Sequence, residues 1–303
     1  MQIEKTVFES PEAMKEFVLR CEDHFRRELA AAVETIVTDK DADMILLSGP
    51  SCSGKTTATA RISGGCTDAG VTVKPVSADD FYRDRSELIA ESPDGVPDLE
   101  TFSALDGELL SGCFGRLFSG RPAMLPHFDF VTQRRDGYEV YSKPAGTKLL
   151  MEGIQTIYPE FRYLLTSKNI SFHGIYVCPR REVSFGELCF SPEELRFMRR
   201  VVRDNRTRSA EPGYTCELWE SVVANERCNM QPFAGKFDLQ IDSVLGYEPF
   251  VIRAPFLAVM EKMPSDHPAW ELWGDLVEKV KKLPDIPAEF VPTDSVFREF
   301  IGD

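Results

Sequence analysis

A glycine-rich segment with one lysine lies directly after an apolar run. Residues 49–57 read GPSCSGKTT and follow Met44 to Leu47, which fits the pattern G-x-x-x-x-G-K-[ST] and supplies the strand that its mechanism requires. Backbone N–H groups of such a loop bind phosphate oxygens, the lysine neutralises phosphate charge, and a hydroxyl binds Mg²⁺. The pattern predicts a nucleoside triphosphate ligand. The predicted loop residues are Gly49, Ser51, Cys52, Ser53, Gly54, Lys55, Thr56 and Thr57, with Thr56 as the Mg²⁺ hydroxyl.

An acidic segment follows the next apolar run, residues 71–76. It reads SADDFYRDR from Ser77 to Arg85 and places Asp79 at the expected end of a strand. A carboxylate there can accept the proton of an attacking hydroxyl, although a solvated acidic turn is the simpler alternative. The side chains expected to line the adjacent cleft are Asp80, Phe81, Tyr82 and Arg83.

Two further segments carry groups suited to binding. LPHFDFVTQRR, residues 125–135, combines aromatic and polar side chains that can stack on a flat ligand and hydrogen-bond its edge, and its alternation fits an ordinary β-strand equally well. Its candidate substrate ligands are Phe128, Phe130, Gln133 and Arg135. KLLMEGI places Glu152 at a strand end, where a carboxylate can hold Mg²⁺ through water; burying an acid there without a cation is costly.

An arginine cluster stands out in this acidic chain. Asp204 is the one acid within LRFMRRVVRDNRTRS, and we expect the cluster to bind a small polyanion. Its members are Arg196, Arg199, Arg200, Arg203, Arg206 and Arg208.

The elements that must position these groups follow an α/β pattern. Apolar runs at 44–47, 71–76, 148–151 and 171–177 alternate with segments that can form helices, which predicts a parallel sheet with ligands beyond the carboxyl ends of its strands. Helical spacing predicts a helix over 11–37, and the C-terminal part adds a strand-like DLQIDSVL and helices near 250–263 and 270–283. Residues 91–97 and 133–146 are expected to form long loops or an inserted hairpin. Trp270 and Trp273 are interpreted as a packing stripe.

Composition narrows the class of protein. The 303 residues carry a formal net charge of −14, which disfavours a nucleic-acid partner. Eight cysteines without a C-x-x-C pair indicate reduced thiols, and no run approaches the ~18 apolar residues of a membrane span. We therefore expect a cytoplasmic protein with no membrane partner. Cys52 within the loop permits redox inhibition, but an inert loop residue is the preferred interpretation.

Taken together, these segments resemble the uridine kinase and phosphoribulokinase family of P-loop kinases. GPSCSGKTT, SADDFY, LPHFDFVTQRR, LLMEGI and RRVVRDNRTR occur in the family's order over roughly residues 40–245. WESVVANE, FDLQIDSVLGYE and VPTDSVFREFIGD are similar to bacterial uridine-kinase-like proteins that carry an N-terminal TGS-type module, which we do not expect here. The resemblance implies a P-loop NTPase core at 41–245 with a lid at about 186–212, an N-terminal helical extension at 1–40 and a C-terminal helical segment at 246–303 packed on the core.

The resemblance also implies roles for single residues. It implies transfer of the γ-phosphoryl group of ATP to a primary hydroxyl, with Asp79 as general base and Lys55, Arg203 and Arg208 on phosphates. Arg200 would reach toward the substrate, with Arg200 and Arg203 counted as catalytic and Arg208 as an ATP ligand. The Mg²⁺ environment would be Thr56, Glu152 and Asp79.

Departures from the family pattern concern the substrate. Glu100 stands where an aspartate usually meets the ribose hydroxyls, and Phe128 and Gln133 replace the tyrosine and histidine that read a pyrimidine. Ala210 stands where the family commonly has an arginine, and Glu194 replaces the aspartate of the family's D-x-R pattern. We expect a nucleoside acceptor, uridine or cytidine first, with Tyr82, Arg83, Phe130 and Arg135 as further ligands.

Two alternatives stay open at this point. The same chemistry on a sugar, polyol or other small hydroxyl compound keeps Asp79 and changes the acceptor. The second alternative is a non-catalytic regulatory protein that binds ATP at the loop without transferring phosphate. A homo-oligomer is possible in any of these cases.

Overall fold

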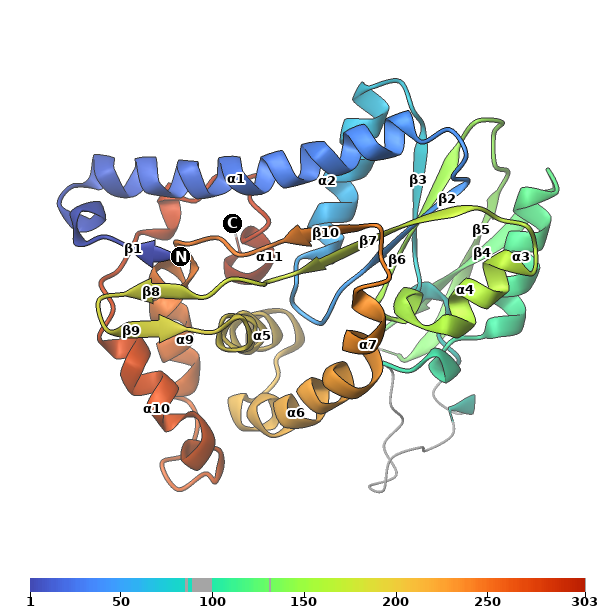
Figure 1. Ribbon diagram of the computed structural model, residues 1–303. Helices are drawn as coiled ribbons and strands as arrows, with labels where there is room; N and C mark the ends of the chain where they lie inside the picture. Colours follow the sequence, from blue (N-terminus) through green and yellow to red (C-terminus); the bar gives the residue numbers. More distant parts are fainter. Residues whose placement is uncertain (85–86, 89–99, 131, 303) are drawn as a thin grey trace.

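The computed structural model of the chain describes residues 1–84, 87–88, 100–130 and 132–302 (Figure 1). Its central sheet has five parallel strands in the order β10-β7-β2-β6-β3. Their bounds are β2 Met44–Ser48, β3 Val73–Ser77, β6 Lys148–Glu152, β7 Phe172–Cys178 and β10 Leu239–Asp242. The predicted α/β fold with a parallel sheet is confirmed, and the four predicted strands agree with the observed ones to within two residues.

The strand register brings the carboxyl ends of three neighbouring strands together. Leu47 of β2 and Ser77 of β3 both pair with Glu152 of β6. The chain leaves β2 into the glycine-rich loop, leaves β3 toward Asp79 and leaves β6 at Glu152. The groups that the sequence marked for chemistry therefore lie on one edge of the sheet, as expected for ligand sites in such folds.

Helices cover both faces of the sheet, which explains why its strands are apolar runs and not alternating ones. In β2, Ile45 and Leu47 belong to one core cluster, and Met44 and Leu46 belong to the other. The first face is covered by α1 Pro11–Thr38 and α2 Lys55–Asp68, and the second by α3 Gly107–Phe118 and α4 Pro159–Thr166.

The terminal segments pack into the first of these cores. The predicted N-terminal helix is α1, and it is preceded by β1 Gln2–Ile3, which pairs with β8 Val183–Phe185; β8 pairs in turn with β9 Leu188–Phe190. The C-terminal helices are α8 Glu248–Val251, α9 Arg253–Met260, α10 Ala269–Lys281 and α11 Arg298–Ile301. Trp273 stacks on Phe197 with ring centroids 3.6 Å apart, so the packing interpretation holds for it.

Two further segments were predicted as an inserted hairpin and a lid. The predicted inserted hairpin is formed by β4 Ala123–Asp129 and β5 Arg134–Tyr141, which replaces the alternative of a long loop from 133 to 146. The predicted lid is split: residues 188–190 pair in β9, and α5 Pro192–Arg208 buries Leu195, Phe197 and Met198 in the core. That residues 186–212 act as a lid stays a prediction.

The remaining elements are short connections and one further helix. They are α6 Pro212–Asn225, a π-helical turn Glu226–Met230, α7 Gln231–Ala234, and the 3₁₀ turns Lys5–Phe8, Asp79–Phe81, Phe102–Ala104, Ile154–Ile157 and Ala288–Phe290. The predicted loop at 91–97 lies outside the described residues. Among the helices that the structure describes, none combines the length and apolar character needed to cross a bilayer.

Candidate active site

The glycine-rich loop connects β2 to the first turn of α2. Gly54 has φ +87°, and Cys52 has φ +60°, a left-handed conformation that is uncommon for a residue with a side chain. Gly49 lies so close to β7 that a Cβ atom there would clash with the carbonyl oxygen of Val177. The loop is thus a tight turn at the N-terminus of a helix, the arrangement that binds phosphate.

Gly49→Ala should disrupt the loop, because the added methyl group has no space against the β7 backbone. We expect a loss of about 1–3 kcal/mol in the free energy of unfolding, measured by urea denaturation. Gly64→Ala is the matched control: Gly64 lies inside α2 with open space around it, and alanine should stabilise that helix by about 0.5–1 kcal/mol. Equal stability of wild type and Gly49→Ala would contradict the close packing of the loop on β7.

Lys55 faces the two carboxylates at the strand ends. Its Nζ donates to the Pro50 carbonyl at 3.1 Å, and its charge favours the ionised forms of both Asp79 and Glu152. Burial raises the pKa of Asp79, against the opposing effects of Lys55 and of a hydrogen bond from Tyr82. Burial likewise raises the pKa of Glu152, to about 7. The site therefore holds two half-buried acids that share one cation.

A bound triphosphate with Mg²⁺ fits this arrangement. Among the residues that the structure describes, no cluster of three or more metal-ligating side chains is present, but Mg²⁺ in kinases is commonly held by one or two protein groups, waters and the phosphates themselves. Thr56 is exposed on the first turn of α2, and Glu152 lies across from it at the end of β6. Within the described part of the chain the buried Ser53 hydroxyl has no hydrogen-bond partner, and a phosphate oxygen would supply one.

The arginines of α5 have mostly internal partners. Arg196 is ion-paired with Glu226 at 2.6 Å, and Arg199 with Glu248 at 2.5 Å. Asp204 lies within 4 Å of three guanidinium groups, those of Arg200, Arg203 and Arg208. The expectation that the whole cluster binds a small polyanion is wrong for Arg196 and Arg199, because carboxylates from distant parts of the chain neutralise them.

The arginines with predicted roles lie on the side of α5 that faces the loop or at its end. Arg200 donates to the Ser51 hydroxyl at 3.3 Å, and Arg203 donates twice to Asp204. Arg208 has a side chain that is 59% exposed, and its charge opposes the burial that raises the pKa of Asp79. Its predicted contact with ATP, and those of Arg200 and Arg203 with phosphate or substrate, stay predictions.

An aromatic group borders Asp79 on the other side. Tyr82, Phe128 and Phe130 make mutual edge contacts with centroids 5.4–6.2 Å apart. Gln155 donates to the Tyr82 hydroxyl at 2.7 Å, and no motif in the sequence indicated this partner. Tyr82 and Phe128 are buried, whereas Phe130 is 54% exposed and offers a ring face to a ligand.

Other predicted substrate ligands already have protein partners. Arg135 lies among Asp84, Glu87 and Asp106, with its closest contact 3.0 Å to Asp106, so its guanidinium braces the hairpin. Glu100 accepts a hydrogen bond from Asn225 at the end of α6. Gln133, with φ +54°, lies in the turn of the hairpin. The backbone N–H of Arg83 donates to the Ala104 carbonyl at 3.0 Å. The structure brings Tyr82, Phe128 and Phe130 together, and the substrate contacts of Arg83, Glu100, Gln133 and Arg135 stay predictions.

The C-terminal segment also reaches the loop, which no motif in the sequence indicated. Thr57 Oγ1 donates to Glu299 Oε2 at 3.3 Å across 242 residues of sequence. A Cβ atom on Gly54 would lie 2.7 Å from Val296, and Arg61 is ion-paired with Asp294 at 2.7 Å. Residues 294–299 therefore pack beside the loop and the N-terminal part of α2, while Thr56 stays exposed.

Cys52 lies within the phosphate loop. Its side chain is only 3% exposed, and in the described part of the chain all eight cysteines are free thiols. Redox inhibition through Cys52 stays a hypothesis.

Comparison with known proteins gives one distant sequence relative. Uridine-cytidine kinase C of Dictyostelium discoideum is 29% identical over 140 residues, which cover 44% of this chain and 28% of the relative. The chain thus matches little more than a quarter of that protein's length. No family model matches the chain.

Three solved structures are similar in arrangement. A possible uridine kinase from Bacillus stearothermophilus shares 20% identity (TM-score 0.44; 72% of this chain and 98% of that one). A putative fructose transport system kinase from Silicibacter sp. TM1040 shares 17% (0.47; 70% and 98%), and D-glycerate 3-kinase from Cryptococcus neoformans shares 14% (0.43; 71% and 87%).

Proposed function

We propose that this chain is a distant member of the uridine kinase and phosphoribulokinase family of P-loop kinases and that it transfers the γ-phosphoryl group of ATP to a primary hydroxyl of a nucleoside. The observation that carries the proposal is the convergence of Lys55, Asp79 and Glu152 at the mouth of the phosphate loop. Phosphoryl transfer depends on positioning and on neutralising charge, and these residues supply both.

Each residue has a separate task in the proposed reaction. Asp79 accepts the proton of the acceptor hydroxyl; its raised pKa makes it a stronger base than an ordinary carboxylate. Tyr82 and Gln155 fix the direction of that carboxylate. Lys55 neutralises charge on the transferring group. Mg²⁺, when bound by Thr56 and Glu152 with the phosphates, supplies further charge neutralisation.

The acceptor is proposed to be uridine or cytidine. The exposed ring of Phe130, beside Tyr82 and Phe128, suits stacking on a planar base, and the relative in Dictyostelium discoideum is named a uridine-cytidine kinase. The runner-up acceptor is a sugar or polyol, favoured by the engagement of Glu100 with Asn225, which occupies the carboxylate expected to meet the ribose.

The test is ADP release from Mg²⁺-ATP by the purified protein against a panel of nucleosides, sugars and polyols. We expect stimulation by uridine or cytidine. Stimulation by a sugar or polyol alone would keep the chemistry and reject the nucleoside. ATP binding without stimulation by any acceptor would favour the non-catalytic alternative.

Glu299→Gln should strengthen ATP binding, because its carboxylate lies against Thr57 on the helix turn that meets the phosphates. Removing that negative charge lowers the repulsion, and we expect a Kd about three- to tenfold lower by isothermal titration calorimetry. Glu289→Gln, an exposed acid on the same C-terminal segment, should leave the Kd unchanged. Weaker binding by Glu299→Gln would instead make Glu299 a ligand of the nucleotide.

A further inference from the structure

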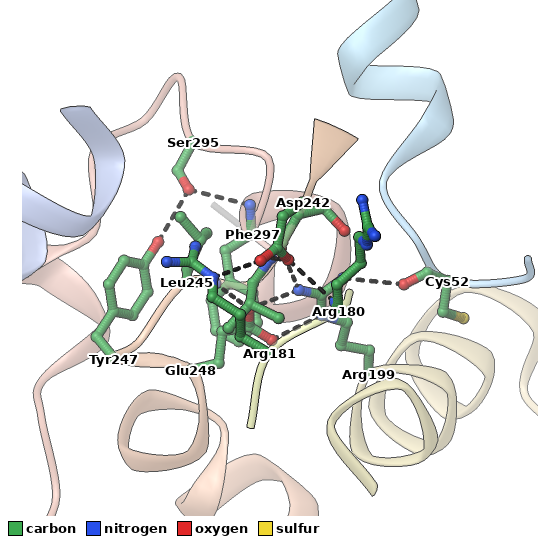
Figure 2. Close-up of polar contacts among 12 residues, drawn as sticks. Cys52, Arg180, Arg181, Arg199, Asp242, Leu245, Tyr247, Glu248, Ser295 and Phe297 are labelled. Atoms are coloured by element: carbon green, nitrogen blue, oxygen red, sulfur yellow. Dashed lines mark hydrogen bonds and ion pairs between the residues drawn. The ribbon is translucent and has the colours of Figure 1, made fainter. Parts of the chain in front are cut away.

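A fully buried ion pair lies directly behind the phosphate loop. The side chains of Arg199 on α5 and Glu248 on α8 are each 1% exposed. Arg199 Nε donates to Glu248 Oε2 at 2.7 Å and Nη2 donates to Oε1 at 2.5 Å, so the contact is bidentate (Figure 2). Glu248 also accepts from the backbone N–H of Leu245 at 2.5 Å. Both charged groups are thus held in one orientation.

Stability alone is a weak reason for such a pair. Removing two charges from water is costly, and replacing a buried pair by uncharged residues of similar volume is often neutral or stabilising. The remaining donors of Arg199 indicate what the pair does instead. Nη2 donates to the Ser243 carbonyl at 2.8 Å, and Nη1 donates to the Cys52 carbonyl in the phosphate loop at 3.0 Å.

The bond to Cys52 sets the direction of a peptide group. In a trans peptide the C=O and the following N–H point in opposite directions. Arg199 holds the Cys52 carbonyl toward α5, and the Ser53 N–H of the same peptide donates to the Pro50 carbonyl at 3.3 Å, which closes a turn of the loop. Arg196 Nε does the same one residue earlier, by donating to the Ser51 carbonyl at 3.0 Å. Two consecutive loop carbonyls are thereby bound by arginines of α5.

Cys52 also needs support in its conformation. It is a non-glycine residue at φ +60°, which costs of order 1 kcal/mol and persists only where the surroundings impose it. Its carbonyl is bound by Arg199, and its thiol is buried in the same core cluster as Phe197 and Phe300. Release of that carbonyl would let the loop relax.

We propose that Arg199 and Glu248 form a positioning pair, which holds the Cys52 peptide and the Pro50–Ser53 turn, and thereby keeps the loop in the shape that binds the phosphates of a nucleotide. The proposal rests on the proposed function of this loop in binding ATP. Neither residue touches the nucleotide; they act through the loop backbone. Arg196 and Arg199 are thus each occupied twice, by a carboxylate and by a carbonyl of the loop, and neither is available to a polyanion.

The test is the double variant R199M/E248Q, which removes both charges and leaves an amide oxygen to accept the Leu245 N–H. We expect a melting temperature close to that of wild type, a Kd for ATP raised about tenfold, as for loss of one aligned hydrogen bond, and faster alkylation of Cys52. The Cys52 peptide is followed by mass spectrometry with iodoacetamide, with the exposed Cys189 and Cys228 as internal references. R253M is the matched control: it removes an arginine of α9 that is paired with Asp285, and it should change none of these three quantities.

The outcomes separate this proposal from the proposed function. A folded R199M/E248Q protein with wild-type alkylation of Cys52 overturns the positioning role. If the wild type binds neither ATP nor inorganic triphosphate, the proposed function fails, while Cys52 alkylation still decides whether the pair holds the loop. Should the double variant not fold, R199K keeps the charge next to Glu248 but lacks the fork that reaches Cys52, and the same alkylation rate decides.

Discussion

Asp79→Asn should lower acceptor-dependent ADP release by about 100- to 10,000-fold, the range for loss of a general base, with little change in the Kd for ATP. Asparagine keeps the size of the side chain and can still accept a hydrogen bond from Tyr82, but it cannot take the proton of the attacking hydroxyl. The measurement is kcat with the best acceptor from the panel, together with ATP titration calorimetry.

The matched control for this variant is Asp136→Asn. Asp136 is a half-exposed acid on the hairpin that pairs with His127. Its replacement should leave turnover unchanged. If Asp79→Asn turned over as fast as wild type, the general-base role would be lost and the non-catalytic alternative would gain support.

Lys55→Met should lower kcat on the order of 100- to 1,000-fold, as for removal of one group that stabilises transition-state charge. Among the charges that oppose the raised pKa values of Asp79 and Glu152, that of Lys55 has the largest effect, so its loss leaves two acids near the phosphates without their main counter-charge. We therefore expect the Kd for ATP to rise as well, which separates this variant from Asp79→Asn.

Lys74→Met is the control for Lys55. Lys74 belongs to the same sheet, on β3, and its amine pairs with Glu139 of the hairpin at 3.0 Å. Activity of that variant should match wild type. A Lys55→Met protein with unchanged kcat and unchanged affinity would mean that the loop does not bind the transferring phosphate.

The two tests also distinguish a folding defect from a chemical one. Neither Asp79 nor Lys55 belongs to the two buried apolar clusters that carry the fold. Both variants should therefore have melting temperatures close to that of wild type. A large drop in melting temperature would show that a loss of activity comes from a folding defect.

Local patterns in the sequence were enough to predict the strands and their edge of the sheet. Met44–Ser48 and Lys148–Glu152 are short apolar runs because helices cover both their faces. The phosphate loop follows the first run, and Glu152 ends the second. The glycine-rich loop is equally local, since its turn needs Gly54 in the left-handed region and its helix follows at once.

Charge partners were not predictable from local patterns. Six arginines close together in sequence indicated an anion site, yet Arg199 pairs with Glu248, 49 residues away, and Arg196 with Glu226, 30 residues away. A guanidinium takes whichever carboxylate the fold brings to it, and spacing along one helix does not contain that information. Arg135 and Glu100 are further cases, each engaged by a protein group before any substrate.

The sequence by itself determined the phosphate loop, the acid after β3 and the parallel sheet that presents them, because each depends on neighbours a few residues away. Only the tertiary structure decided which arginines support the loop, which ones gather around Asp204, and that residues 294–299 pack beside the N-terminal part of α2. Those contacts join segments up to 242 residues apart, and they form because burial requires every charge and carbonyl in the core to have a partner.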